Sequence, residues 1–457
     1  MKKHNEQALA SAPIGKLFFK LAAPAVAAQV INVLYNIVDR VYIGHIPETG
    51  AAALTGVGVT MPAILIISAF AALVSAGGAP RVSMLMGQDN HEDAERILGT
   101  CALTLVLISA VLTVIMQLFA EPILRLFGAS DATLPYALEY MSIYSLGTVF
   151  VQLSLGLNAF ITAQGFSGTS MLTVTIGAVL NIILDPIFMF VFGMGVRGAA
   201  LATIISQAVS SVWVVRFLMS EKATLRLRVQ NLRIVPKLLV PCLLLGLSPF
   251  IMQITENFVS VCYNVSLLRY GGDTAVGAVT ILSSTLSFSL LIVHGLTQGA
   301  QPIMSYNYGA GNGERVRKTF RIAFVSCLIG SMAVWALAEF APNLIAGIFT
   351  SDEELTEYTA WALRIYMAGS GIFGIQVACQ QSFVSLGQAK SAIFLALLRK
   401  VILLIPLILI LPRLGIFENQ AFAVFLAEPV ADTIAVCTTA AMFFSQFKKL
   451  TSGERSA

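Results

Sequence analysis

Long apolar stretches, separated by short polar segments, fill most of this chain. A helix that crosses a bilayer needs about 20 mostly apolar residues. Twelve stretches meet that requirement, at residues 17–44, 52–78, 95–119, 135–157, 168–192, 196–219, 239–268, 275–302, 320–346, 357–380, 390–412 and 420–446. The pattern predicts an all-α polytopic membrane protein with twelve transmembrane helices.

The composition supports this interpretation. Of the 457 residues 57% are hydrophobic and only 11% are charged, whereas soluble proteins average about 25% charged residues. The net charge of +4 is too small to indicate a nucleic-acid partner. The six cysteines are scattered singly through apolar segments, which argues against a zinc site or a disulfide framework. We expect no metal and no cofactor.

The basic residues predict the orientation of the spans. If both termini lie on one side of the membrane, the loops and span borders of that side hold all but six of the 28 Lys and Arg residues. Arg399 and Lys400 are counted among these loop residues. By the positive-inside rule, both termini are then cytoplasmic in a multi-pass protein of the cell inner membrane.

The two halves of the sequence resemble each other. An offset of 222 residues aligns Pro80 with Pro302, and near the start an offset of 225 aligns Pro24 with Pro249. Six spans in each half make the repeats parallel, which places a substrate path at their interface. We expect an N-terminal six-helix bundle at 1–220, a basic cytoplasmic linker at 221–238 and a C-terminal six-helix bundle at 239–457.

Ionisable residues inside the predicted spans are the first candidates for function. Such a residue costs about 2.5–3.5 kcal/mol at the centre of a membrane helix. Asp39 lies in the first span, and Asn181 and Asp185 share one face of the fifth because they are four residues apart. Thr203 of the sixth span returns to about the same depth. Two buried acids with an amide between them can take up a proton near neutral pH. The alternatives are that Asp39 pairs with Arg40, or that Asp185 only caps a helix that breaks after it.

The C-terminal half carries different acids. The offsets place Asn264 and Leu407 at the positions of the two aspartates, so the protonation site belongs to the N-terminal half. Glu256 lies near the middle of the seventh span, where it could attract a cationic substrate or a metal cation. Glu428 and Asp432, four residues apart in the twelfth span, either act together or mark a helix kink.

Further polar and aromatic residues are candidates for a substrate cavity. Each of them also fits ordinary hydrogen bonding or packing between helices. The candidates are Gln29, Asn32, Tyr35, Asn36, Asn158, Gln253, Glu256, Asn257, Phe288 and Gln380. We find no nucleotide-binding motif, no GxSxG nucleophile and no HExxH helix, so neither an enzyme nor an ATP-driven pump is expected.

Two segments carry a resemblance to a known family. "NVLYNIVDRVYIGHI" (32–46) and "LNIILDPIFMFVFGMGVRGAALAT" (180–203) resemble the multidrug and toxic compound extrusion (MATE) family, and most closely its MepA-like branch. The resemblance implies a V-shaped pair of six-helix bundles that exports organic, often cationic, drugs in exchange for H+ or Na+.

The resemblance also implies roles for individual residues. In proton-coupled members an Asp in span one works with an Asn and an Asp in span five and a Thr in span six. Here the matching residues are Asp39, Asn181, Asp185 and Thr203. In sodium-coupled members a Glu in span seven partners an Asp in span ten. Glu256 matches the first of these, but the tenth span contains no acid.

We therefore expect a secondary active antiporter that exports small organic compounds in exchange for H+, working as a monomer among membrane lipids. Three alternatives stay open: a sodium-coupled exporter, a flippase for lipid-linked precursors, and a channel or structural membrane protein. A flippase would need a more basic central cavity, whereas the basic residues assigned to spans, Arg40 and Arg269, lie near the outer ends.

Overall fold

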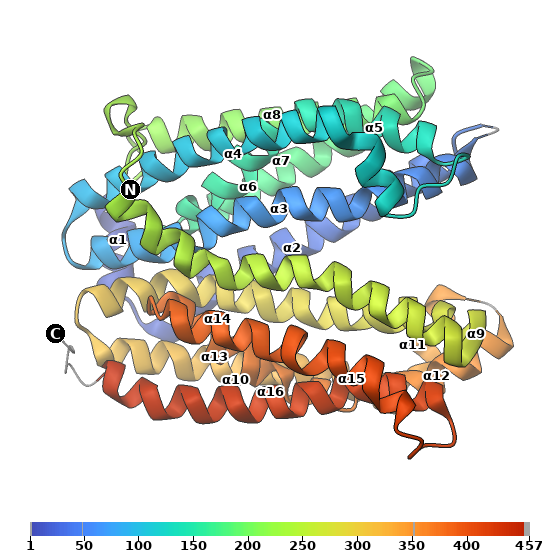
Figure 1. The fold of residues 1–457 in the computed structure, drawn as a ribbon. Helices are drawn as coiled ribbons and strands as arrows, with labels where there is room; N and C mark the ends of the chain where they lie inside the picture. The colour runs from blue at the N-terminus through green and yellow to red at the C-terminus, as the bar shows by residue number, and fades with distance from the viewer. Residues whose placement is uncertain (1, 48, 351, 452–457) are drawn as a thin grey trace. The chain divides into compact units, whose positions relative to one another are not determined.

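The computed structural model describes residues 2–47, 49–350 and 352–451, and these are almost entirely helical (Figure 1). The main helices are α1 (Lys2–Ser11), α2 (Ile14–Gly44), α3 (Gly50–Gly87), α4 (His91–Leu126), α5 (Leu134–Leu146), α6 (Thr148–Ala163), α7 (Ser167–Pro186), α8 (Val196–Met219), α9 (Pro236–Gly309), α10 (Gly313–Phe340), α11 (Pro342–Phe349), α12 (Glu353–Met367), α13 (Phe373–Ser385), α14 (Ala389–Leu397), α15 (Ile405–Ile410) and α16 (Gln420–Thr451). The shorter turns are the π-helices η1 (Ile187–Val191) and η4 (Leu398–Leu404) and the 3₁₀ turns η2 (Val229–Asn231), η3 (Ser370–Ile372) and η5 (Leu411–Arg413).

The described helices account for twelve spans. Nine are long and apolar enough to cross a membrane, and two bent pairs, α5 with α6 and α12 with η3 and α13, raise the number to eleven. Helix α9 has 74 residues and contains a non-helical Gly272. At about 1.5 Å per residue it is far longer than a bilayer is thick, so it supplies two spans.

Spans four and ten are bent, which the apolar pattern does not predict. The bends measure 59° and 48°. Gly147 separates the two halves of span four and Gly369 lies at the break in span ten. The two glycines are related by the 222-residue offset of the repeat, so both halves of the chain use the same device.

The turn after the second span of each repeat is also duplicated. Asn90 is the N-cap of α4 and Asn312 is the N-cap of α10. Each side chain accepts a hydrogen bond from the backbone N–H three residues on, at 3.2 Å and 3.1 Å. Asp89 and Gly311, just before them, both have a positive φ, 61° and 73°. A left-handed residue followed by an Asn cap thus starts the third span of each half.

The chain forms two compact units. Unit 1 contains the N-terminal residues up to Ala12 together with Ala23–Phe250, and unit 2 contains Pro13–Ala22 together with the residues from Ile251 on. The boundary lies inside α9, and the division of the chain at 221–238 stays a prediction. Each repeat therefore begins its first long helix in the unit that holds the other repeat.

Glycines allow the beginnings of α9 and α2 to pack in units 1 and 2, respectively. In unit 1 a Cβ atom at Gly77 of α3 would overlap the carbonyl oxygen of Cys242, near the start of α9. In unit 2 a Cβ atom at Gly299 would overlap Ala22 of α2. Gly77 and Gly299 are again 222 residues apart, so the same glycine admits the incoming helix in both units.

Arg399 and Lys400 do not lie in a cytoplasmic loop, so that prediction was wrong. Both belong to η4, within the span Ala389–Arg413, and they are only 2% and 3% exposed. The span tolerates two cations because carboxylates from α9 and α16 neutralise them.

Candidate functional site

Helices α2, α7 and α8 bring the four predicted coupling residues together in unit 1. The side-chain amide of Asn181 donates to Oδ1 of Asp185 at 3.1 Å and lies 3.4 Å from Oγ1 of Thr203. Thr203 in turn donates to the carbonyl of Ala199 at 3.0 Å. Asn181 is the residue that links α7 to α8 at this depth.

The two aspartates meet at the same place. Asp39 of α2 is 7% exposed and Asp185 of α7 is completely buried, and their carboxyl groups lie close enough to interact with each other. Carboxyl groups can share a hydrogen bond only when one of them carries a proton, because two carboxylates offer no donor. A proton on either carboxyl group would therefore stabilise this contact.

Neither structural alternative for these acids fits the geometry. No ion pair joins Asp39 to Arg40 within the described part of the chain. Asp185 does not mark a broken helix either, because the helix passes through Pro186 and continues as the π-helix η1.

Several buried acceptors at the site have no donor. Oδ1 of Asp39, Oδ2 of Asp185 and Oδ1 of Asn181 accept no hydrogen bond from any described residue. A buried polar atom without a partner calls for an explanation, which can be a bound water, an ion or a functional role. At this site the free acceptors lie on both aspartates and on the asparagine between α7 and α8.

Two tyrosines beside the site were missed by the sequence reasoning. Tyr140 and Tyr144 of α5 are buried and stacked, with ring centroids 5.8 Å apart. Tyr140 also lies beside Thr203. Their spacing of four residues, which places both rings on one face of the span, is the signal that could have identified them.

The predicted cavity residues of unit 1 differ in environment. Asn36 donates to the backbone carbonyl of Asn32 at 2.6 Å, within its own helix. Asn158 of α6 donates to the carbonyl of Ser170 at 3.2 Å and so joins α6 to α7. The remaining candidates, Gln29 and Tyr35, lie half-buried on α2.

The candidates of unit 2 are spread over two helices. Gln253, Glu256 and Asn257 lie on the first arm of α9, the part before Gly272. Phe288 lies on the second arm, after Gly272, and is exposed. Gln380 of α13 is buried and lies 3.2 Å from the sulfur of Met252. Gln380 therefore packs inside unit 2.

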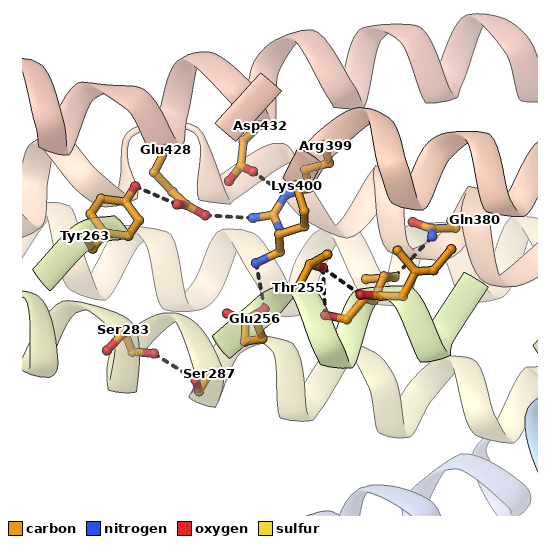
Figure 2. A network of polar contacts seen from close by, with 12 residues as sticks. Thr255, Glu256, Tyr263, Ser283, Ser287, Gln380, Arg399, Lys400, Glu428 and Asp432 are labelled. Atoms are coloured by element: carbon orange, nitrogen blue, oxygen red, sulfur yellow. Dashed lines mark hydrogen bonds and ion pairs between the residues drawn. The ribbon is translucent and has the colours of Figure 1, made fainter. Parts of the chain in front are cut away.

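A buried network of charges occupies unit 2 (Figure 2). Arg399 donates to Oδ1 of Asp432 at 2.6 Å and to Oε1 of Glu428 at 2.8 Å. The hydroxyl of Tyr263 donates to Oε2 of Glu428 at 2.8 Å. Lys400 donates to Oε2 of Glu256 at 2.7 Å. Glu428 and Asp432 do act together, as joint partners of one guanidinium.

No group of three or more His, Cys, Asp or Glu side chains that could hold a metal ion occurs among the residues that the structure describes. Glu256, the acid considered for a sodium site, has an ammonium group as its partner instead.

Comparison with known proteins gives one family. The family model described as MatE matches the chain twice, at residues 24–187 and 249–410. The two matches begin at Pro24 and Pro249, the prolines that the 225-residue offset aligned. The duplication and the resemblance are confirmed.

Three individual relatives are informative. "Multidrug export protein MepA" of Staphylococcus aureus (strain N315) is 26% identical over 441 residues, which is 94% of this chain and 93% of that protein. A solved structure described as "MATE multidrug transporter DinF-BH" is 32% identical with a TM-score of 0.87, covering 95% of this chain and 96% of that one. "MATE in the bent conformation" is 20% identical with a TM-score of 0.90 and 98% coverage of both chains, and so supports the fold alone.

Proposed function

Because this chain belongs to the MatE family of multi-pass membrane transporters, we propose that it is a secondary active multidrug exporter that releases organic cations in exchange for protons. It is a transporter and not an enzyme. The relatives named for multidrug export or transport support small drug-like molecules as its substrates.

The observation that carries the proton coupling is the contact between Asp39 and Asp185. A proton on either carboxyl group removes one negative charge from the N-terminal site and allows the hydrogen bond between them. Asn181 donates to Asp185, and its contact with Thr203 fixes the position of the amide. We infer that protonation rearranges α2 and lowers the affinity for the drug. Drug and proton then weaken each other's binding by the same factor.

A proton suits this chain better than sodium as the coupling ion. Hard cations are held by several oxygen ligands, and the C-terminal acid nearest that role, Glu256, is bound by Lys400. The flippase alternative is also disfavoured. Arg399 and Lys400 are basic groups within a span, but carboxylates neutralise both of them, so they offer no charge to a pyrophosphate headgroup.

The test is dye accumulation in inverted vesicles under an imposed pH gradient or an imposed sodium gradient. We expect the pH gradient alone to drive ethidium uptake, and Asp39→Asn to abolish that dependence. Asp131→Asn is the matched control, since Asp131 is an exposed acid of the same unit. Full dependence on the pH gradient in the Asp39→Asn protein would refute the scheme. Uptake driven by the sodium gradient would show that Na+ and not H+ is the coupling ion.

We also propose that both termini face the cytoplasm of a cell inner membrane and that the protein works as a monomer. The basic residues outside the spans still support this orientation after Arg399 and Lys400 are removed from the count. A membrane-impermeant thiol reagent should label a cysteine placed at Glu354 in intact cells and leave one placed at Lys222 unlabelled. The reverse pattern would overturn the orientation.

A further inference from the structure

The first arm of α9 has two different exposed faces. Four apolar residues, Phe258, Val261, Val265 and Leu268, are each about three-fifths exposed and lie on one side of the helix. A second stripe lies roughly a quarter-turn away and is polar. It contains Gln253, Glu256, Asn257, Ser260 and Asn264. The apolar face suits lipid and the polar stripe suits water, and Glu256 lies on the polar stripe.

The ion pair between Glu256 and Lys400 is asymmetric. The side chain of Glu256 is 56% exposed, whereas that of Lys400 is 4% exposed. The Lys400 ammonium therefore reaches Glu256 from inside unit 2 and covers one side of the carboxylate (Figure 2). The other side stays open.

The remaining acids of the network are engaged elsewhere. Both oxygens of Glu428 are used, one by Arg399 and the other by Tyr263, and Asp432 also binds Arg399. Glu256 is thus the carboxylate that compensates Lys400 in this cluster. Lys400 is built into the π-helix η4 and so stays close to Glu256.

We propose that Lys400 is a tethered competitor for Glu256 that sets the selectivity of the transporter for substrate charge. A cationic substrate that binds Glu256 must share the carboxylate with the lysine ammonium or displace it. Opposing the substrate's charge in this way weakens binding, which favours release. The inference rests on the proposed export of organic cations and does not depend on how export is coupled.

The experiment measures equilibrium binding of ethidium to the purified full-length protein, without any ion gradient. Lys400→Met leaves Glu256 charged and open to solvent. We therefore expect ethidium to bind about fivefold more tightly than to the wild type, because its charge then meets an exposed carboxylate without a competing ammonium. Lys390→Met is the matched control, because it removes an exposed positive charge from the beginning of the same span. Its affinity should equal that of the wild type, and an uncharged dye should bind all three proteins equally.

A double variant separates charge from folding. Glu256→Gln alone leaves a buried lysine without its carboxylate and is expected to fold poorly. Glu256→Gln combined with Lys400→Met removes both charges and should lose the gain in ethidium binding. The proposal is overturned if Lys400→Met binds ethidium no more tightly than the wild type, whether or not the wild type binds it. It is also overturned if the uncharged dye gains equally or the double variant keeps the gain. A failure of proton coupling would appear only in the vesicle experiment.

Discussion

Arg399 is one of the largest buried side chains in the described part of the chain, and its contacts explain how a span can hold it. Its planar guanidinium binds Glu428 and Asp432 and lies 4.3 Å above the ring of Phe373. A lysine cannot reproduce this fork of donors. Charge, hydrogen bonds and an aromatic face together replace the water that the guanidinium has lost.

The sequence did not identify this network because its two cations follow an apolar stretch that begins close to Lys390. Basic residues near a span border are ordinarily read as loop residues. The acids were found, since Glu428 and Asp432 share a helix face. Their partners come from another helix, and the pairing depends on tertiary contacts that no local pattern contains. Asp39, Asn181 and Asp185 were easier to identify, because depth and spacing alone align them.

Replacing Arg399 tests the network at the level of one residue. Arg399→Met leaves two buried carboxylates unpaired, and we expect it to lower the free energy of unfolding by about 3–5 kcal/mol. The readout is the temperature at which the detergent-solubilised protein loses its monodisperse peak. Arg399→Met combined with Glu428→Gln and Asp432→Asn should recover much of the loss.

Arg197→Met is the control for this measurement. Arg197 forms an exposed ion pair with Glu139, with side chains 60% and 38% exposed, so its replacement should change the melting temperature little. Equal stability of Arg399→Met and the wild type would show that the buried network does not hold unit 2 together.

At the level of elements, the beginning of α9 crosses α3 with almost no space between the backbones. A Cβ atom at Gly77 would overlap the carbonyl of Cys242, and one at Gly246 would overlap the carbonyl of Leu73. Helices in membranes approach closely where small residues face each other. The apolar pattern predicted both helices, but it does not report which glycines lie at a crossing.

Alanine substitutions along α3 test this crossing. Gly77→Ala must push the two backbones apart, and we expect a loss of about 1–3 kcal/mol in stability. Gly58→Ala, on the same helix, is the control because a Cβ atom there meets nothing within 4 Å. That substitution should leave the melting temperature unchanged or raise it. Equal effects of the two changes would contradict the close crossing.

At the level of the whole molecule, duplication explains most of what could be predicted. The offsets identified from the sequence also relate the Asn caps, the glycines at the two bends and the glycines that admit the incoming helices. The repeat does not predict where its two copies differ. The N-terminal half buries two aspartates, whereas the C-terminal half buries acids that are paired with Arg399 and Lys400. Each half therefore stabilises its buried charges by different contacts.

Separate expression of the two halves tests how they depend on each other. Residues 1–230 lack the segment up to Phe250 that completes unit 1, and residues 231–457 lack Pro13–Ala22 of unit 2. We expect each fragment to be degraded when produced alone and the two to accumulate together when co-expressed. Stable accumulation of either fragment by itself would contradict this mutual dependence, as judged by immunoblots of membranes.

The exchanged first helices have a consequence for ancestry. A single repeat would have lacked the helix start that packs against its own glycine. We therefore infer that the ancestral protein was a dimer of identical subunits, in which each subunit placed the beginning of its first helix in the other. Fusion of two copies into one polypeptide then fixed this exchange of helices within a single chain. The two copies could then diverge within one chain. Here the N-terminal half holds Asp39 and Asp185, whereas bases neutralise the buried acids of the C-terminal half.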